Sequence, residues 1–360
     1  MRTVGVEEEL LLVDPDSGVP VAVAGSVLAQ ADAQHAELIE AELQQQQVEI
    51  GTRPCETLTE LAGQLAHWRS KAAAAAERAG ARIVASGTSP LPVTPELTVK
   101  PRYQRMVEAF GLTTAEQLTC GCHVHVGIES ADEGVAVIDR IRPWLPVILA
   151  LSVNSPYWQG VDTGYASFRS QAWTRLPTAG PTDLFGSAAA YHAEVERLLR
   201  TEVALDLGMI YFDARLSHHL PTVEIRIADV CLHRDDSLLV AALIRALVDT
   251  AARDWRAGVP APTVGTSVLE LATWRAGRSG LDGKLIDPLG GQPLPARRVL
   301  ADLIGHVGQA LADQGDNDLV ADLLEALLGR GTGAVHQRRW AQEKKDLGAM
   351  VLRLADVTAS

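Results

Sequence analysis

The segment VGVEEELLLV at residues 4–13 most constrains the fold, because it sets three consecutive glutamates among residues that favour a buried β-strand. Side chains at positions i and i+2 of a strand lie on the same face. Glu7 and Glu9 therefore share one face, and Glu8 shares the other with the flanking valines and leucines. Two carboxylates side by side are costly to bury without a cation between them. Glu8 in turn needs an arginine partner if helices cover its face.

Two later segments repeat this pattern. In HVHVGI, His123 and His125 share a face and the intervening valines take the other, and in TVEIRIAD the same holds for Glu224 and Arg226. The stretch VEIG adds Glu49 in a similar setting. Each segment alone has an ordinary alternative: acidic residues on a solvated edge strand, two hydrogen-bonded histidines, or a simple salt bridge. Their conjunction favours one polar face shared by several strands.

The residue types on that face indicate divalent cations. An oxygen-rich set with one or two histidines favours Mg²⁺ or Mn²⁺ over zinc, which prefers cysteine or more histidine. Carboxylates that hold divalent ions are a usual way to bind the phosphates of a nucleoside triphosphate. A histidine pair with a distant glutamate is also an iron site in some oxygenases, so a triad of His123, His125 and Glu224 stays open.

Composition narrows the partners. The 32 basic and 45 acidic residues give a net charge of −13, which argues against nucleic acid or an anionic membrane as a partner. An anionic substrate would need local arginines or metal ions. No apolar run is long enough to span a membrane and the start lacks a signal-peptide core, so we expect a cytoplasmic protein. The four irregularly spaced cysteines are expected to be reduced, with Cys120 and Cys122 buried by packing.

The order of the elements predicts a mixed α+β fold. Strands are expected over residues 3–13 and 43–51, and a capping box of Thr57 and Glu60 predicts the start of a helix. A long apolar helix is expected from residue 236. From about residue 267 the pattern is helical, with residues 287–295 as a loop. With no repeat and no linker, residues 1–360 are expected to form a single domain.

Five segments, in order, resemble the type 2 glutamate-cysteine ligases, also called carboxylate-amine ligases, of the glutamine synthetase superfamily. They are VGVEEELLLVDP, QQQQVEIGT, CGCHVHVGI, SFRSQAWTRLPTAGP and TVEIRIAD. The resemblance implies a curved antiparallel sheet whose concave face forms the active site, with helices on the outer face. It also implies an ATP-dependent ligase that forms an amide through an acyl phosphate. The implied substrates are glutamate and cysteine or another amine, and the glutamate-cysteine ligase activity could be weak.

The resemblance also assigns a set of metal ligands. Glu7 and Glu9 match the family's GxExE element, Glu49 matches the glutamate of its second strand, and Glu224 matches the glutamate of its ExR element. Glu42 stands where relatives carry another acidic residue. Because Glu42 lies seven positions before Glu49, a regular strand would turn it to the opposite face, so a bulge or loop is expected there.

The remaining implied roles concern phosphate and substrate. His123 matches the superfamily's metal and phosphate histidine, and His125 is expected to contact the nucleotide. Arg226 is expected to contact the transferring phosphoryl group. Arg169 and Arg175, in a loop-like stretch near glycine and proline, are candidates for binding the substrate carboxylate or the phosphate.

Other classes of function stay open from the sequence. A guanido-kinase-like phosphotransferase would share the sheet and the metal carboxylates, and a non-haem oxygenase would use the histidine pair. A non-catalytic metal or nucleotide binder is a third class. The chain has no GxxxxGK[ST] loop, so ATP binding rests on the carboxylate set and the resemblance. We expect small-molecule amino acid and amine substrates and a homodimer.

Overall fold

A seven-stranded antiparallel sheet forms the centre of the molecule, in a computed structural model that describes residues 2–30 and 39–360. The strand order is β2-β3-β1-β5-β9-β8, and β4 pairs with the end of β1. The strands of this sheet are β1 Val4–Val13, β2 Ile39–Ala41, β3 Gln47–Gly51, β4 Arg82–Val84, β5 Gly121–Gly127, β8 Ala214–Leu216 and β9 Thr222–Asp229. The expected strand at residues 3–13 is confirmed, whereas the second one begins only at residue 47.

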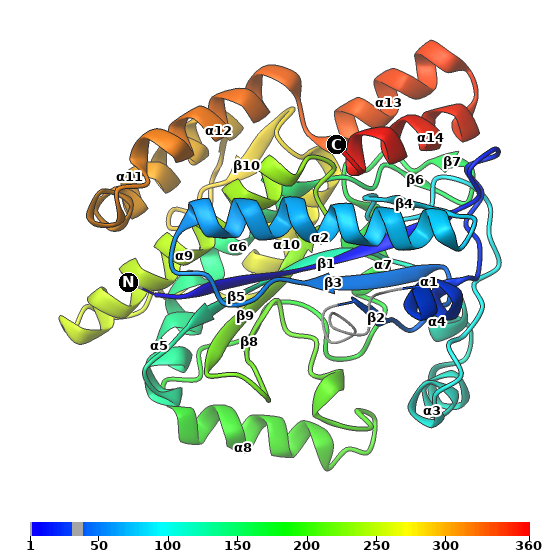
Figure 1. The fold of residues 1–360 in the computed structure, drawn as a ribbon. Helices are drawn as coiled ribbons and strands as arrows, with labels where there is room; N and C mark the ends of the chain where they lie inside the picture. The colour runs from blue at the N-terminus through cyan, green and yellow to red at the C-terminus, as the bar shows by residue number, and fades with distance from the viewer. Residues whose placement is uncertain (1, 31–38) are drawn as a thin grey trace.

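Helices surround the sheet and dominate the C-terminal part of the chain (Figure 1). The first seven are α1 Ala24–Gln30, α2 Leu58–Arg78, α3 Pro101–Phe110, α4 Leu112–Ala115, α5 Ala131–Ile141, α6 Leu145–Ser152 and α7 Phe168–Trp173. The others are α8 Ala188–Leu199, α9 Arg234–Arg256, α10 Thr266–Ser279, α11 Ala296–Gln314, α12 Asn317–Arg330, α13 Gly333–Lys344 and α14 Leu347–Thr358. None of the helices in the described residues could span a membrane.

Two small hairpins lie outside the main sheet. They are β6 Tyr157–Trp158 with β7 Val161–Asp162, and β10 Lys284–Ile286 with β11 Pro293–Pro295. The second hairpin corrects the expectation of a plain loop at residues 287–295, because its end residues pair with β10. The capping box before α2 is confirmed: the Thr57 side chain accepts from Glu60 N, and the Glu60 carboxylate accepts from Thr57 N.

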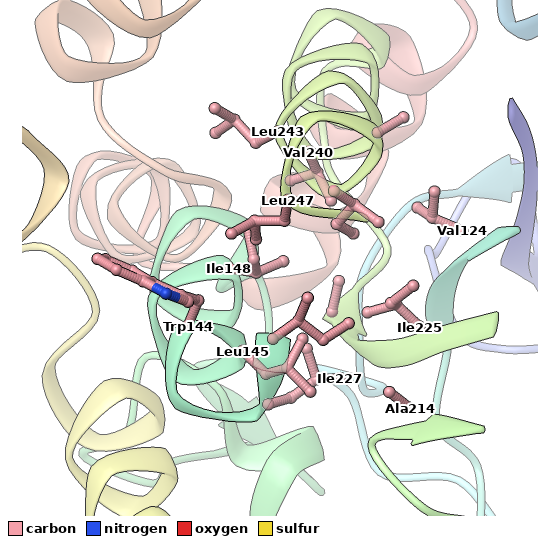
Figure 2. Packing of buried hydrophobic residues seen from close by; sticks show 14 of the residues in the cluster. Val124, Trp144, Leu145, Ile148, Ala214, Ile225, Ile227, Val240, Leu243 and Leu247 are labelled. Atoms are coloured by element: carbon pink, nitrogen blue, oxygen red, sulfur yellow. The ribbon is translucent and has the colours of Figure 1, made fainter. Parts of the chain in front are cut away.

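One face of the sheet is covered by α2, α5, α6 and α9. In Figure 1, α2 lies across β1 and β3. Figure 2 shows the apolar side chains of β5 and β9, such as Val124 and Ile225, directed at Leu145, Ile148 and Val240 of α6 and α9. The long apolar helix expected from residue 236 is thus buried within this chain.

Glu8 lies in the middle of that covered face and is fully buried. Arg69 of α2 binds its carboxylate with two hydrogen bonds, Nε to Oε2 at 2.8 Å and Nη2 to Oε1 at 2.7 Å. Ser237 of α9 donates a third hydrogen bond. Arg69 also donates to the carbonyl oxygens of Cys231 and Leu232. The arginine partner required by the sequence is therefore Arg69, and the pair ties β1 to two helices.

Removing Arg69 should leave an unpaired buried carboxylate, so we expect Arg69→Met to lower the free energy of unfolding by about 3–5 kcal/mol. Arg82→Met is the matched control, since Arg82 forms an ion pair with the exposed Asp356, and it should cost no more than about 1 kcal/mol. Urea unfolding measures both. Replacing Glu8 by Leu in the Arg69→Met background should recover much of the loss. Equal losses for the two single variants would contradict a central role for the pair.

Candidate active site

The register of β1 with its neighbours brings the first acidic residues together. Glu9 lies opposite Glu49 across the β1–β3 ladder, and Glu7 lies opposite His123 across the β1–β5 ladder. Because alternate residues share a face, all four side chains project from the side of the sheet opposite Glu8. The strand alternation read from the sequence is confirmed here.

The β5–β9 ladder extends the same row. His125 lies opposite Glu224, and the register shifts between Cys122 and Val124. This irregularity is a β-bulge, which re-aims side chains and is common beside active sites. Glu224 and Arg226 share the polar face as expected, and Arg226 Nη1 donates to Glu224 Oε1. The row of polar side chains therefore crosses four strands.

These side chains line a cavity of about 650 Å³, called here the main cavity. Its charged and histidine lining is Glu7, Glu9, Glu40, Glu42, Glu49, Arg102, His123, His125, Arg215, His218, His219, Glu224 and Arg226. Six glutamates thus face three arginines, so the described lining carries excess negative charge. A cavity with this imbalance is suited to cations, or to an anionic ligand that arrives with cations.

Glu9, Glu42 and Glu49 form a carboxylate cluster in this cavity, with one oxygen from each within 4.8 Å of the others. Glu42 reaches the cluster because it follows the end of β2, outside the regular strand, as its odd spacing required. Burial and the nearby charge of Glu42 raise the pKa of Glu9 from 4.5 to about 7. Burial, together with its three acidic neighbours, raises the pKa of Glu49 well above its usual value. The cluster repels itself unless protons or cations bind.

Glu7 lies between the two histidines. Its carboxylate is 3.4 Å from His123 Nδ1 and 3.2 Å from His125 Nε2. Burial opposes ionisation of Glu7, but the contacts with both histidines outweigh it and hold the pKa well below the usual value. Burial and the Arg226 guanidinium lower the pKa of His123 to about 4, so the ring is neutral near pH 7. Its buried Nε2 has no hydrogen-bond partner among the described residues.

Glu224 is held by two arginines. Arg215 of β8 binds it with two hydrogen bonds, at 2.7 Å from Nε and 3.0 Å from Nη2, and Arg226 adds a third. Although burial opposes it, these charges depress the pKa of Glu224, which therefore stays ionised. Arg215 was not predicted from the sequence. The short alternating stretch DARLS at residues 213–217 is the local signal that could have indicated its strand. Glu224 also lies close to Glu7 and His125. One ligand atom from each of the three residues could therefore still contact a cation.

The two arginines predicted near residue 170 lie at different places. Arg169 is in the first turn of α7, not in a loop, and its guanidinium lies over Gly121, where a side chain would clash with it. It also lies over the ring of Trp173, which lines the main cavity. Arg175 follows α7 and binds Glu116 at 3.1 Å. Neither arginine lines the main cavity itself, but only Arg169 packs against a residue that does. The geometry thus brings Arg169, rather than Arg175, to the edge of the site.

The donor set fits divalent cations. Two three-residue groups contain oxygen ligands beside a histidine, Glu7 with Glu49 and His123, and Glu7 with His125 and Glu224. The carboxylate cluster supplies a third, all-oxygen group. Such groups suit Mg²⁺ or Mn²⁺. Among the described residues, His123, His125 and Glu224 do not form a group of their own, so the oxygenase triad has no counterpart.

The cysteines take no part in this site. All four are buried, as expected for Cys120 and Cys122, and none of them forms a disulfide. Burial raises the pKa of Cys122 and of Cys120, so neither thiol is activated as a nucleophile. The ionisable side chains that dominate the cavity are therefore carboxylates, histidines and arginines.

The central antiparallel sheet thus carries an acidic face with three groups of residues that could each hold a cation. The chain belongs to glutamate-cysteine ligase family 2, whose model matches residues 3–350. It is 53% identical over 340 residues to a putative glutamate–cysteine ligase 2-1 of Streptomyces avermitilis, covering 94% of both chains. It is 52% identical to a putative glutamate–cysteine ligase 2 of Streptomyces coelicolor, again covering 94% of both. The protein is accordingly an ATP-dependent ligase that forms carbon–nitrogen bonds.

Solved structures share the fold. The chain aligns with a glutamate–cysteine ligase of Francisella tularensis in complex with AMP, at a TM-score of 0.71 and 14% identity, covering 100% of this chain and 89% of that one. It aligns with a bifunctional glutathione synthetase of Pasteurella multocida at a TM-score of 0.72 and 15% identity, covering 99% of this chain and 52% of that one. At such identities the likeness concerns the fold alone.

The raised pKa of Glu9 predicts how metal-free protein responds to pH. The folded chain keeps a proton that the unfolded chain has released, so this carboxyl lowers stability as pH rises from 4.5 to about 7. In EDTA, the Tm of Glu9→Gln minus that of the wild type should therefore grow from about pH 5 to about pH 8. Mn²⁺ should raise the wild-type Tm more than that of the variant. A difference that shrinks with pH would contradict the assignment.

Proposed function

We propose that this protein joins a substrate carboxylate to an amine in an ATP-dependent reaction that passes through an acyl phosphate. Glutamate is the proposed carboxylate substrate, and cysteine or another amine is the acceptor. The family membership supports the reaction class. The carboxylate cluster of Glu9, Glu42 and Glu49 carries the proposal, because three self-repelling carboxylates in one cavity call for divalent cations.

The proposed metal ligands are Glu7, Glu9, Glu42, Glu49 and His123, with Mg²⁺ or Mn²⁺ as the ions. When bound, such ions neutralise the phosphate charges of ATP and orient them for in-line transfer. The protein's own part is to hold the carboxylates in place. Ladder pairing between β1, β3 and β5 fixes four of these side chains, and the neutral ring of His123 offers its unpaired Nε2.

Glu224 is also proposed as a ligand, through its position beside Glu7 and His125. Its larger part is to hold Arg215 and Arg226, whose guanidinium groups it binds directly. Arg226 would stabilise the negative charge that develops on the transferring phosphoryl group. A fixed guanidinium does this well, because it needs no rearrangement during the reaction. His125, next to Arg226 on the same face, would contact the nucleotide.

The reaction then has two steps. A carboxylate oxygen of the substrate bonds to the γ-phosphorus of ATP, the bond from that phosphorus to the bridging oxygen breaks, and ADP leaves. The amine nitrogen next bonds to the acyl carbon, the carbon–oxygen bond to phosphate breaks, and phosphate leaves while the nitrogen loses a proton. No protein nucleophile takes part, so positioning and electrostatic stabilisation are the contribution of the chain.

Arg169 is the better of the two arginine candidates for a substrate carboxylate. Its guanidinium lies beside Gly121 and Trp173 at the edge of the main cavity. Arg175 is engaged by Glu116 and would need to leave that partner to bind a phosphate or carboxylate. Family membership also favours a ligase over the guanido-kinase-like phosphotransferase, the non-haem oxygenase and the non-catalytic binder.

The broader setting of this activity is also proposed. We infer that residues 1–360 act as a single catalytic domain, that the polar sheet face is concave around its ligands, and that the protein works as a homodimer in the cytoplasm. Its partners would be small molecules, with neither nucleic acid nor a membrane among them. The net charge of −13 supports the exclusion of polyanionic partners.

A phosphate-release assay tests the proposal. Purified protein with ATP, Mg²⁺ or Mn²⁺, glutamate and a panel of amines should release phosphate in an amine-dependent manner, with slow release from glutamate alone. Glu9→Gln should lower this rate by on the order of a hundredfold or more, since it removes a charge from the cation site. Glu108→Gln, on the exposed side of α3, is the control and should keep the wild-type rate. Unchanged turnover in Glu9→Gln would refute the site.

A further inference from the structure

A second cavity of about 410 Å³ adjoins the main one and is called here the side cavity. Trp173 lines both of them. Asp213, Arg169, Trp274 and Glu270 are the other lining residues that matter below. The volume suits a ligand of the size of an amino acid or a small amine. Of the roles proposed above, only the binding of a substrate carboxylate by Arg169 involves a residue that lines this cavity.

Asp213 is the most unusual residue of the side cavity. It is only 8% exposed, yet its carboxylate accepts no hydrogen bond from the described part of the chain. Its backbone is held firmly: the N–H donates to Gly180 O at 3.0 Å, and the carbonyl oxygen accepts from Arg226 N at 2.9 Å. Buried carboxylates are normally paired or hydrogen-bonded. A buried acid on a fixed backbone, with no hydrogen-bond donor among the described residues, therefore points to a ligand in the side cavity.

The nearest cation does not fill that need. Arg169 is the one charged group whose attraction acts on Asp213 among the described residues, and it opposes the rise in the pKa of Asp213 to about 7 that burial causes. The Arg169 guanidinium is directed elsewhere, to the carbonyl oxygens of Arg226 and Ile227 at 3.3 and 3.4 Å and toward Asp229 at 3.9 Å. No ion pair joins Arg169 to Asp213 within 4.0 Å.

The other walls favour a cation. Trp173 and Trp274 supply aromatic surface, and indole rings attract ammonium groups through their π faces. Glu270 adds an exposed carboxylate at the rim. An anionic ligand would meet both carboxylates, while Arg169 already donates to backbone carbonyl oxygens. A neutral donor could hydrogen-bond Asp213 but would not balance its charge. The cavity also adjoins the reacting centre, since Arg169 and Arg226 both lie over Trp173, at 5.4 and 5.8 Å from its ring.

We propose that the side cavity binds the primary ammonium group of an amino substrate of the ligase, with Asp213 as its counter-ion and Trp173 and Trp274 as its aromatic walls. The substrate role rests on the proposed ligase function, whereas ammonium binding does not. The ammonium group could belong to the amine acceptor or to the α-amino group of glutamate.

A binding experiment without ATP tests the site itself. Saturation-transfer NMR titrations would compare cysteamine with 2-mercaptoethanol, which replaces the ammonium group by a hydroxyl, and L-glutamate with glutarate, which lacks the α-amino group. Wild-type protein should prefer the ammonium member of at least one pair by on the order of tenfold or more. The pair that shows the preference identifies the source of the ammonium. Equal binding within both pairs would overturn the proposal.

Two variants locate the effect. Asp213→Asn keeps the shape of the side chain and should remove the preference, whereas Glu270→Gln, at the exposed rim, should keep most of it. Thermal unfolding of both variants checks the fold, and the wild-type comparison above stands even if Asp213→Asn is unstable. An unchanged preference in a folded Asp213→Asn protein would also overturn the assignment.

A kinetic arm separates this inference from the ligase proposal. In the phosphate-release assay, Asp213→Asn should raise KM for the amino substrate that prefers the cavity by on the order of tenfold, while KM for ATP stays the same. If Asp213→Asn loses the ammonium preference in binding but the wild type releases no phosphate, the side cavity is supported and the ligation chemistry is rejected. Normal release with no effect of Asp213→Asn on either KM would reject the side cavity alone.

Discussion

The buried ion pair between Glu8 and Arg69 fixes which face of β1 looks inward. A slip of one residue in a strand moves every side chain to the opposite face. Such a slip would bury Glu7 and Glu9 under the helices and turn Val4, Val6, Leu10 and Leu12 to the opposite face. Arg69 prevents it, because it holds the Glu8 carboxylate from α2 and also binds the backbone that leads into α9. By holding Glu8 on the covered face, the ion pair thus keeps Glu7 and Glu9 on the open face.

The open face follows the opposite rule, since its carboxylates have too few protein partners. Glu9, Glu42 and Glu49 approach one another in a cavity whose glutamates outnumber its arginines. The fold tolerates this repulsion because the backbone is held in place. The ladders between β1, β3 and β5 hold it from the sides, and the core holds it from the other face. Cations that bind with their phosphate ligands would relieve this repulsion, so the destabilisation at the cluster strengthens their binding. In this way a sheet built by ordinary alternation presents a face suited to binding cations.

Alternation predicted a large part of this from sequence, and non-local contacts account for the rest. A period of two assigned faces in β1, β5 and β9 without knowledge of their neighbours. It could not name Arg69, which is 61 residues from Glu8, or Arg215, whose role depends on a strand of three residues. Glu42 needed the chain path after β2. Arg175 looked equivalent to its neighbours in the same motif, and only the packing after α7 shows that it binds Glu116.

Anomalous diffraction from crystals grown with Mn²⁺ and a non-hydrolysable ATP analogue would locate the bound ions without reference to activity. We expect Mn²⁺ peaks within coordination distance of Glu9, Glu42 and Glu49, and of Glu7 with His123, roughly 2.0–2.3 Å from their ligand atoms. Peaks absent from this face, or bound elsewhere while the carboxylates stay unoccupied, would contradict it.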